Sequence, residues 1–441
     1  MYRILIADEA ISLIRDGDCI CVNSFVGIEN PVELHEALNR RYEQTHFPKH
    51  LTIVSSAGFG VWDENRNAEG YIRAGAVDRL ICGHFGAMPS TKKIILENHF
   101  EAYNLPLGCI SHAIRAQAGG IPGALSKVGL DIFVDPRREG PGINQISTDS
   151  SFVKVVEVDG EEFLYYKLPK ITATLIKGTA ADRKGNISFD DMYMSGDALS
   201  ICQAVKSNNG IVIVQVDRIV DMPTRPRNTI IPGCLVDAIV VVEPEKRDDA
   251  LQALTGSFEI PFEHWHEWTE KLDAATAEHR RESVASSIIG RRAAQELRKE
   301  DIVNIGIGIP ETISRFAKQN GMLDHITLTV ESGGIGGFAN ITAKTPIVVF
   351  CLTFNTKGLE VQEQDGNVTI VRNGTIPKFV NDVRSISFSA RKAIANGQKV
   401  LYVTERCVFI LTARGLKLLE VYPGVNVQKD IFALLPFGVE A

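Results

Sequence analysis

Residues 10–34 read AISLIRDGDCICVNSFVGIENPVEL, and residues 293–313 read AAQELRKEDIVNIGIGIPETI. Both stretches pass through a helical segment, an Arg, an Asp, a strand, a Gly-Ile turn, a Pro and the start of a new helix. The strand that follows each copy repeats as well, as LTIVSSAGFG at 51–60 and ITLTVESGGIG at 326–336. The sequence therefore predicts two copies of one α/β unit, with a site between the two halves.

Strand-like runs rich in β-branched residues alternate with helical patterns along the rest of the chain. This alternation is typical of α/β folds, so we expect two pseudo-equivalent open α/β domains with mostly parallel sheets. The turn Lys184-Gly185-Asn186 predicts that antiparallel hairpins are mixed in. The clearest strand runs are CICVNSF at 19–25, LTIVSSAG at 51–58, GIVIVQV at 210–216, LVDAIVVVEP at 235–244, IVVFCLTF at 347–354 and KVLYVTE at 399–405.

The best candidate for a domain boundary is the polar, Trp-containing stretch at 256–282, GSFEIPFEHWHEWTEKLDAATAEHRRE. It separates a first α/β domain at 1–255 from a second at 283–441. The second domain, which contains the Glu331 region, is much the shorter of the two.

Composition limits the class of protein. The 441 residues are 44% hydrophobic, and their 37 Gly and 18 Pro are spread along the chain, which excludes collagen-like and disordered classes. The net charge of −7 without a basic run argues against nucleic acid or a membrane surface as partner. The N-terminus shows no leader pattern, and the eight cysteines form no CxxC pair. We expect a cytoplasmic protein with reduced, structural cysteines and no metal.

Glu331 is the outstanding candidate for chemistry. It directly follows the strand ITLTV and precedes a Gly-rich turn, so it lies at a carboxyl end of a strand, where open α/β sheets bind ligands. The matched position in the first half is Ser56. Glycines beside Glu331 would let a substrate approach the backbone, whose N–H groups can stabilise an oxyanion. The alternative is a strand-end Glu that caps the next helix.

Other motifs are weaker or absent. The turn Gly306-Ile307-Gly308-Ile309-Pro310 resembles phosphate-binding loops, but it is not a full GxGxxG. The motifs GxSxG, GxxxxGK[ST] and HExxH are absent, which argues against most hydrolases, kinases and metalloproteases. His84 in CGHFG follows a strand and could line a cleft, although a structural role is the simpler interpretation.

Blocks along almost the whole chain resemble the family I CoA-transferases, and among these the fused acetate/propionate CoA-transferases that are related to succinyl-CoA:3-ketoacid CoA-transferase. Their order and number carry the resemblance. The blocks are GIENP at 27–31, LTIVSSAGFG at 51–60, CGHFG at 82–86, EAYNLP at 101–106, KVGLDIFVDPRREG at 127–140, EFLYYK at 162–167, IPGCLVDAIVVVEP at 231–244, NIGIGIP at 304–310, VESG at 330–333 and ERCVFILTARGLKLLEVYPGV at 405–425.

The resemblance implies a CoA transfer that runs through a covalent enzyme thioester with ping-pong kinetics. Glu331 would be the nucleophile. Backbone groups that bind CoA or the oxyanion would belong to Gly306, Gly308, Gly333, Gly336 and Gly337. The pocket for the acyl group and the carboxylate would contain Gly27, Asn104, Leu107 and Gly108.

Two departures from the family pattern stand out. Leu107 replaces a glutamine that the family places after AYN-x-P. In addition, VESG runs directly into GIGGFANIT, so a long segment that separates these two motifs in relatives is missing. The second domain is therefore expected to be shortened.

The expected function is transfer of CoA between a short acyl-CoA and a carboxylic acid, with coenzyme A as a substrate and no cofactor. One alternative is a non-catalytic acyl-CoA-binding or interaction protein, motivated by the missing segment and Leu107. Another is an isomerase or thioester hydrolase on a related scaffold. Apolar surface on a shortened domain predicts a homo-oligomer, a dimer or a tetramer, as the resemblance also implies.

Overall fold

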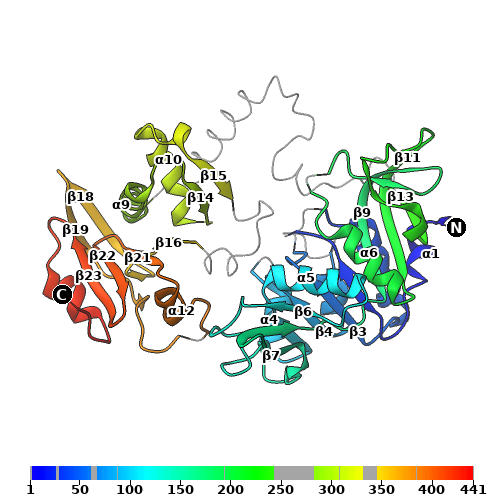
Figure 1. The fold of residues 1–441 in the computed structure, drawn as a ribbon, viewed down its shortest axis with the longest axis horizontal. Helices are drawn as coiled ribbons and strands as arrows, with labels where there is room; N and C mark the ends of the chain where they lie inside the picture. Colours follow the sequence, from blue (N-terminus) through cyan, green and yellow to red (C-terminus); the bar gives the residue numbers. More distant parts are fainter. Residues whose placement is uncertain are drawn as a thin grey trace. The chain divides into compact units, whose positions relative to one another are not determined.

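The chain forms two compact units, Met1–Trp265 and His266–Ala441, coloured from blue to green and from yellow to red in Figure 1. The computed structural model describes residues 2–25, 29–60, 67–86, 88–192, 194–242, 283–306, 308–330, 345–383 and 385–440. The predicted linker 256–282 lies outside the described residues, so the predicted domain boundaries stay a prediction.

The first unit alternates strands and helices as predicted. Its helices are α1 (Ala7–Ile11), α2 (Val32–Thr45), α3 (Glu69–Arg73), α4 (Pro89–Leu96), α5 (Leu107–Ala118) and α6 (Ala198–Ser207). Its strands are β1 (Arg3–Ile4), β2 (Cys19–Val22), β3 (Leu51–Ser55), β4 (Val77–Cys82), β5 (Glu101–Asn104), β6 (Ala124–Ser126), β7 (Val153–Val158), β8 (Glu161–Tyr166), β9 (Ala173–Asp182), β10 (Ile187–Ser188), β11 (Ile211–Val220), β12 (Thr229–Ile231) and β13 (Ala238–Val241).

The main sheet of the first unit is parallel, which confirms the predicted fold class. Its strand order is β1-β13-β11-β9-β2-β3-β4-β5, and every neighbouring pair on this path is parallel. β10 and β12 extend it by antiparallel pairing, and β6, β8 and β7 form a separate antiparallel sheet. Because the path reverses direction between β2 and β9, the carboxyl ends of these central strands form the edge where ligands bind in open α/β sheets.

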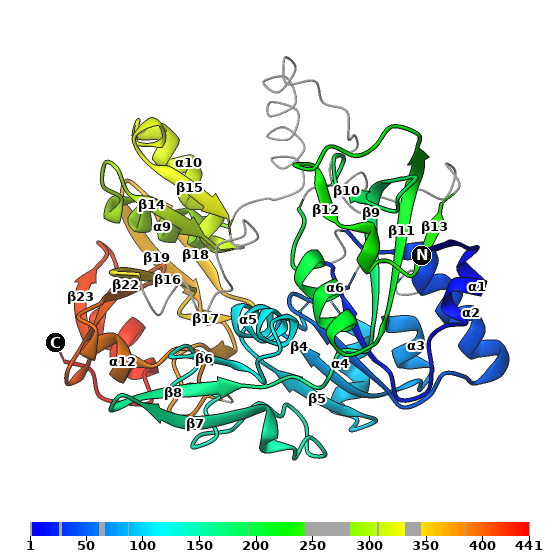
Figure 2. The same ribbon diagram turned by 45° about the vertical axis from the view of Figure 1, so that its right-hand side comes forward.

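Both faces of this sheet are covered by helices. Along β2, Ile20 and Val22 belong to the large core that also contains residues of α1, α2 and α3. Cys19 and Cys21 alternate with them and point to the other face, where α5 and α6 pack against each other. Figure 2 shows the two groups of helices on opposite sides of the sheet.

The predicted hairpin at Lys184-Gly185-Asn186 is present. It joins β9 to β10, which are antiparallel neighbours. Gly185 has a φ of 77°, which glycine adopts without steric cost. The Asp182 carboxylate stabilises the turn, because its Oδ1 accepts the N–H groups of Lys184 at 2.8 Å and of Asn186 at 3.0 Å.

The second unit is built from smaller sheets. Two of its neighbouring pairs, β14·β15 and β16·β21, are parallel, whereas β22 and β23 continue the latter sheet in antiparallel orientation. β17 with β20 and β18 with β19 form antiparallel pairs. The described elements are α9 (Val284–Ala293), β14 (Ile302–Ile305), α10 (Thr312–Gln319), β15 (Thr327–Val330), β16 (Ile347–Cys351), β17 (Asn355–Thr356), β18 (Glu360–Gln364), β19 (Asn367–Arg372), β20 (Ile376–Pro377), α12 (Ala390–Ala395), β21 (Lys399–Val403), β22 (Cys407–Thr412) and β23 (Gly415–Val421).

The sequence repeat is also a structural repeat, with the same register in both units. Cys19 of β2 pairs with Thr52 of β3, and Ile302 of β14 pairs with Thr327 of β15. The residue before each first strand makes the same contacts. The Asp18 carboxylate accepts the Arg15 N–H at 2.8 Å, and the Asp301 carboxylate accepts the Arg298 N–H at 2.8 Å.

The repeat continues further along the chain. In the first unit β9 and β11 are parallel neighbours joined through α6, and in the second unit β16 and β21 are parallel neighbours joined through α12. The stretch between the paired segments differs greatly in length. In the first unit residues 56–172 hold β4 to β8 and the three helices α3, α4 and α5, whereas residues 331–346 are all that lies between β15 and β16. The second unit is therefore short where the sequence predicts a missing segment.

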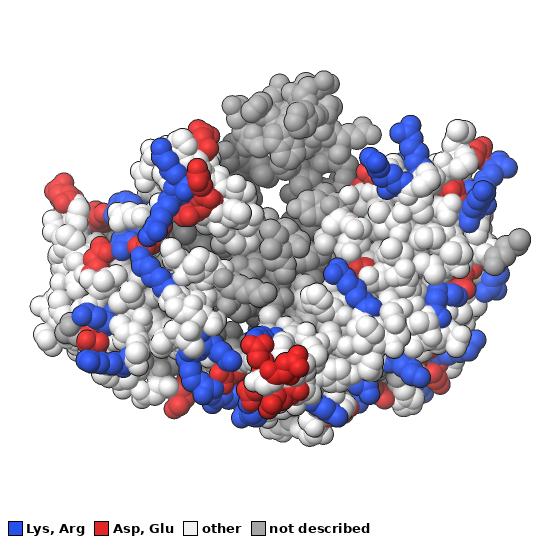
Figure 3. All heavy atoms as spheres, in the orientation of Figure 1, with Lys and Arg blue, Asp and Glu red and all other residues white. Residues whose placement is uncertain are grey.

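Charged side chains of both signs are intermixed on the face drawn in Figure 3. Within the described part of the chain, no helix combines the length and the apolar character needed to cross a bilayer.

Candidate active site

In the first unit, three of the predicted pocket residues lie together at the carboxyl end of the sheet. Asn104 is the last residue of β5, and its N–H donates to the Pro141 carbonyl at 2.8 Å. Leu107 and Gly108 are the first two residues of α5, and both residues are half-buried. The positive end of the α5 dipole is therefore at this edge of the sheet.

Gly83 brings Leu107 close to the end of β3. A Cβ atom on Gly83 would lie 2.2 Å from the Ser56 carbonyl oxygen and 3.2 Å from the Leu107 Cβ. Only glycine allows these three backbone segments to approach so closely. The Leu107 side chain is thus held beside Ser56, the residue that matches Glu331 in the repeat.

Ser56 belongs to a polar cluster that sequence reasoning missed. Its hydroxyl donates to Asp197 Oδ2 at 3.3 Å, and the Ser111 hydroxyl donates to Asp197 Oδ1 at 2.6 Å. Arg115 Nη2 lies 3.4 Å from the same Oδ1 atom. Asn23, which follows β2, accepts the Asp197 N–H at 3.0 Å. A carboxylate with hydroxyl and guanidinium donors therefore occupies the first unit's counterpart of the Glu331 region.

A sequence signal for this cluster exists but is weak. Ser111 and Arg115 are four residues apart on α5 and so lie on one helix face. Asp197 precedes α6 at its N-cap position, yet it makes no side-chain cap hydrogen bond. Asp favours the N-cap position of helices, but the Asp197 carboxylate accepts hydrogen bonds from Ser56 and Ser111, which are distant in the chain.

His84 follows β4 with an exposed side chain. Its carbonyl oxygen accepts the Cys82 Sγ–H at 3.2 Å. A Cβ on Gly58, which has a φ of 82°, would lie 2.7 Å from the same oxygen. These contacts give the His84 backbone a structural role at the strand end.

All eight cysteines are free thiols; six of them are buried, Cys351 is half-buried and Cys234 is exposed. Burial raises the pKa of Cys19 and of Cys82 to about 12, and that of Cys109 to about 11. Such thiols stay protonated at neutral pH and are weak nucleophiles. Within the residues that the structure describes, no three His, Cys, Asp or Glu side chains group as a metal site.

In the second unit, the predicted glycine turn connects β14 to α10, and Pro310 lies in the short 3₁₀ helix Ile309–Glu311 that precedes α10. Gly306 follows β14 directly, and among the described residues no atom lies within 4 Å of the position that its Cβ would take. Gly308 has a φ of 98°, and its N–H donates to Glu311 Oε1 at 3.0 Å. The backbone at Gly306 is therefore open to a ligand.

The strand that leads to Glu331 ends at the same edge. Val330, the last described residue before Glu331, pairs with Ile305 at the carboxyl end of β14. Ile309 of the glycine turn packs against the same hydrophobic core as Val349 and Cys351, which lie at the carboxyl end of β16. The ends of three strands of the second unit thus converge on one region.

Five predicted site residues lie outside the described residues. These are Gly27, Glu331, Gly333, Gly336 and Gly337. Their predicted roles stay predictions, as does the association of Asn104, Leu107 and Gly108 with residues of the second unit.

A coenzyme A transferase family model matches residues 4–242, more than half of the chain. The chain belongs to this family. It is 32% identical to the acetate CoA-transferase YdiF of Escherichia coli strain K12, with 98% of this chain and 92% of that protein covered. It is 30% identical to the caffeate CoA-transferase of Acetobacterium woodii, with 99% and 94% covered. These similarities favour the transferase over the non-catalytic alternative.

The same relationship holds between structures. The crystal structure of the acyl-CoA transferase YdiF of E. coli O157:H7, described as a thioester complex with CoA, matches with a TM-score of 0.87 and 30% identity. The match covers 100% of this coenzyme A transferase chain and 93% of that chain. The sequence alignment with the strain K12 protein spans 498 residues, more than the 441 residues of this chain, so that relative carries segments that this chain lacks. This agrees with the predicted shortening.

Proposed function

We propose that this protein transfers CoA between a short acyl-CoA and a carboxylic acid, with Glu331 as the covalent nucleophile. The observation that carries the proposal is the position of Glu331 in the sequence, directly after Val330 at the shared carboxyl ends of β14 and β15. A carboxylate at this edge has an open glycine backbone, that of Gly306, on the neighbouring strand.

The proposed CoA transfer proceeds through a mixed anhydride and an enzyme thioester. The Glu331 carboxylate attacks the thioester carbonyl of the acyl-CoA, and the C–S bond breaks to give a mixed anhydride and CoA thiolate. The thiolate then attacks the glutamyl carbonyl, which forms the glutamyl-CoA thioester and releases the acyl group as a carboxylate. An acceptor carboxylate reverses these steps, so that CoA leaves on a new acyl group and Glu331 is regenerated.

Backbone donors are the groups this reaction needs most. Each tetrahedral intermediate carries an oxyanion, which peptide N–H groups stabilise without reorganisation. Gly306, Gly308, Gly333, Gly336 and Gly337 are the proposed donors, and Gly27, Asn104, Leu107 and Gly108 form the proposed pocket for the acyl and carboxylate groups. Coenzyme A enters as a substrate, and no other cofactor or metal takes part.

The proposed substrates are acetyl-CoA or propionyl-CoA with a short carboxylic acid. Acetate is the substrate in the name of one relative and caffeate in that of another. Leu107 is an apolar residue at the start of α5. Its side chain would contact the apolar chain of an acyl group more favourably than a polar substituent on the substrate. We place the reaction in the cytoplasm, in short-chain fatty acid or ketone body metabolism.

The test is to trap the covalent intermediate. The protein is incubated with acetyl-CoA or propionyl-CoA, treated with borohydride or hydroxylamine, and digested for mass spectrometry. We expect a modified peptide that contains Glu331, loss of the modification in Glu331→Gln, and an unchanged yield in the control Glu300→Gln, whose residue lies in an exposed turn.

Two outcomes would contradict the proposal. No adduct together with no acyl exchange over a panel of acids would support the non-catalytic alternative. Hydrolysis of acyl-CoA without exchange would support a thioesterase.

We also propose a homo-oligomer, a dimer or a tetramer. Several large apolar side chains are exposed, among them Ile302 at 75% and Met222 at 77% relative exposure, and such surface is often covered by a partner subunit. Light scattering on the purified protein should give at least twice the monomer mass of 48.4 kDa; a single monomeric species would contradict this.

A further inference from the structure

The second unit contains a charged pair that is fully removed from solvent. Glu405 and Arg406, in the turn between β21 and β22, both have 0% relative exposure, and Arg406 Nε donates to Glu405 Oε1 at 2.7 Å. Among the described residues, Arg406 Nη2 has no hydrogen-bond acceptor. Buried pairs of this kind seldom stabilise a fold more than apolar side chains of equal volume. Stability alone therefore does not explain the pair.

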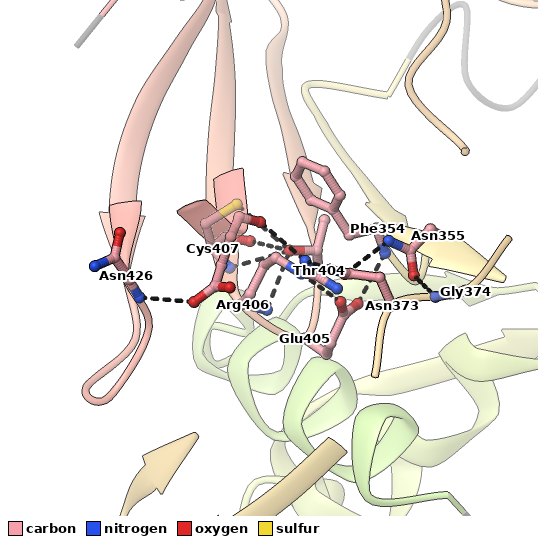
Figure 4. Close-up of polar contacts among 10 residues, drawn as sticks. Phe354, Asn355, Asn373, Gly374, Thr404, Glu405, Arg406, Cys407 and Asn426 are labelled. Atoms are coloured by element: carbon pink, nitrogen blue, oxygen red, sulfur yellow. Dashed lines mark hydrogen bonds and ion pairs between the residues drawn. The ribbon is translucent and has the colours of Figure 1, made fainter. Parts of the chain in front are cut away.

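The pair connects three other segments of the chain to this turn (Figure 4). One of them is the helical segment Val427–Ile431. Glu405 Oε2 accepts the Phe354 N–H at 2.8 Å. Arg406 Nη1 donates to Asn373 Oδ1 and to the Asp430 carbonyl, both at 2.9 Å. The Arg406 guanidinium also lies 4.6 Å from the centre of the Phe354 ring, within the range of a cation–π contact.

A second layer of contacts extends this network to Asn355. Its Nδ2 donates to Asn373 Oδ1 at 3.0 Å, and its Oδ1 accepts the Gly374 N–H at 2.6 Å. Asn355 is only 5% exposed and begins the two-residue strand β17 within the segment that follows β16. The loop that follows β16 is therefore fixed both through its backbone at Phe354 and through the Asn355 side chain.

This loop lies at the edge of the second unit that leads to Glu331. It begins after Cys351, the last residue of β16, and Cys351 packs against the same hydrophobic core as Ile309 of the glycine turn. Ile305, which pairs with Val330, packs in a cluster with Cys351 and Val349. The pair at 405–406 thus holds a loop that starts beside the proposed CoA-binding turn.

The same loop forms one wall of a cavity of about 510 Å³. This volume is in the range of small-molecule sites and can hold a portion of CoA. The lining is rich in hydrogen-bonding groups, and its one lysine, Lys357, makes no ion pair within 4.0 Å among the described residues. The polar lining residues include Ser283, Thr353, Asn355, Thr356, Lys357 and Gln362.

We propose that Glu405 and Arg406 are positioning residues of the CoA-transfer site, which hold the loop 352–357 so that its cavity wall receives part of the CoA. This inference rests on the proposed function. In it, neither side chain touches the substrate, and both act through Phe354, Asn355 and Asn373.

The test compares a variant that removes one contact at the edge of the network with a variant that removes the charged pair at its centre. Asn373→Ala removes the acceptor of Arg406 from an exposed residue, so it leaves the fold intact. Glu405→Gln combined with Arg406→Met removes both charges and keeps the side-chain volumes. The controls are Asn373→Asp, which keeps an acceptor, and Arg292→Met, which breaks the Arg292–Glu420 pair elsewhere in this unit.

Each variant is assayed for kcat, for the KM of acyl-CoA and for hydrogen exchange of peptides that contain 352–357. We expect both test variants to raise the KM at least tenfold with kcat changed less than threefold, and to speed exchange in this loop at least tenfold. Both controls should stay within twofold of the wild type.

Faster loop exchange with an unchanged KM would overturn the inference, because the pair would then be purely structural. Unchanged loop exchange in the double variant would overturn it as well. If the wild type forms no adduct and exchanges no acyl groups, the proposed function fails, whereas calorimetric binding of CoA to the same variants still tests whether the network controls CoA binding.

Discussion

At the scale of single residues, Gly306 and Gly83 show two different uses of glycine. Gly83 has backbone neighbours so close that a methyl group would collide with them, whereas no atom of the part of the chain that the structure describes lies within 4 Å of the position of a Gly306 Cβ. The first glycine is required by packing inside the protein. The second leaves backbone exposed beside β14, where the proposed reaction needs peptide donors.

Replacing Gly306 by alanine should therefore affect the reaction and not the fold. The added methyl group meets open space in the protein, so the melting temperature should change by less than about 2 °C. In the complex the same methyl occupies room that the CoA needs, so we expect kcat/KM to fall at least about tenfold, or ~1.4 kcal/mol. Steady-state kinetics and calorimetry measure both quantities.

Gly438→Ala is the matched control, since Gly438 also has no described residue within 4 Å of its Cβ position but lies near residue 441. It should leave both the kinetics and the melting temperature unchanged. Equal kcat/KM values for Gly306→Ala and the wild type would show that no ligand approaches this turn.

At the scale of elements, the repeated helix–strand–turn frame was predictable, because both copies use the same local signals. Asp18 and Asp301 each precede a strand and accept the same backbone N–H group, so sequence similarity and structure agree there. The close packing of β3, β4 and α5 at Gly83 could not be predicted in the same way. It depends on which strands become neighbours, and this is a property of the whole sheet.

Gly83→Ala should destabilise the first unit. Its Cβ would lie 2.2 Å from the Ser56 carbonyl oxygen and 3.1 Å from the Leu107 Cα, so backbone segments must move. We expect a loss of about 2–3 kcal/mol in the free energy of unfolding, measured by urea denaturation.

The control is Gly119→Ala at the end of α5, where the nearest atom to the new Cβ is 3.6 Å away. This change should alter stability by less than about 1 kcal/mol. A Gly83→Ala protein as stable as this control would contradict the close packing of β3 and α5.

The rest of the candidate site was beyond sequence reasoning for a related reason. Ser56, Ser111 and Asp197 are far apart in the chain, and each alone looks like an ordinary surface or cap residue. Glu405 and Arg406 likewise read as a solvent-exposed turn, although both are fully buried. Glu331 could be singled out because its signal is local, a carboxylate between a strand and a run of glycines.

At the scale of the whole molecule, the two units share the repeated helix–strand–turn arrangement but differ in the size of the sheets that contain it. The first unit has a continuous parallel path of eight strands. The second divides its described strands among smaller sheets, and residues 331–346 replace the long connection of the first unit. The large apolar core of the first unit, which contains residues of α1, α2 and α3, contributes much of the stability of that unit.

His35 should make that stability depend on pH. It is fully buried on α2, and burial lowers its pKa to about 3, whereas an unfolded His titrates near 6.5. Between these values the unfolded chain binds more protons, so stability is fully present above pH 6.5 and falls as the pH drops toward 3. The loss amounts to about 1.4 kcal/mol per pH unit.

Urea denaturation at pH 7.0, 5.5 and 4.5 tests this prediction. His35→Gln, in which no group titrates, should show a flatter pH dependence than the wild type. His50→Gln removes an exposed His that pairs with Asp78 and serves as the control, with a slope close to that of the wild type. Parallel curves for the wild type and His35→Gln would mean that His35 is not buried in the neutral form.

The identical register of the two repeats also limits how many covalently bound CoA molecules one chain can carry. Position 56 in the first unit is a serine whose hydroxyl is engaged by Asp197, and only position 331 in the second unit is a glutamate. A serine cannot enter the anhydride–thioester cycle that a carboxylate allows. The stoichiometry of the proposed intermediate is therefore one CoA per chain, and a dimer or tetramer saturates at two or four equivalents.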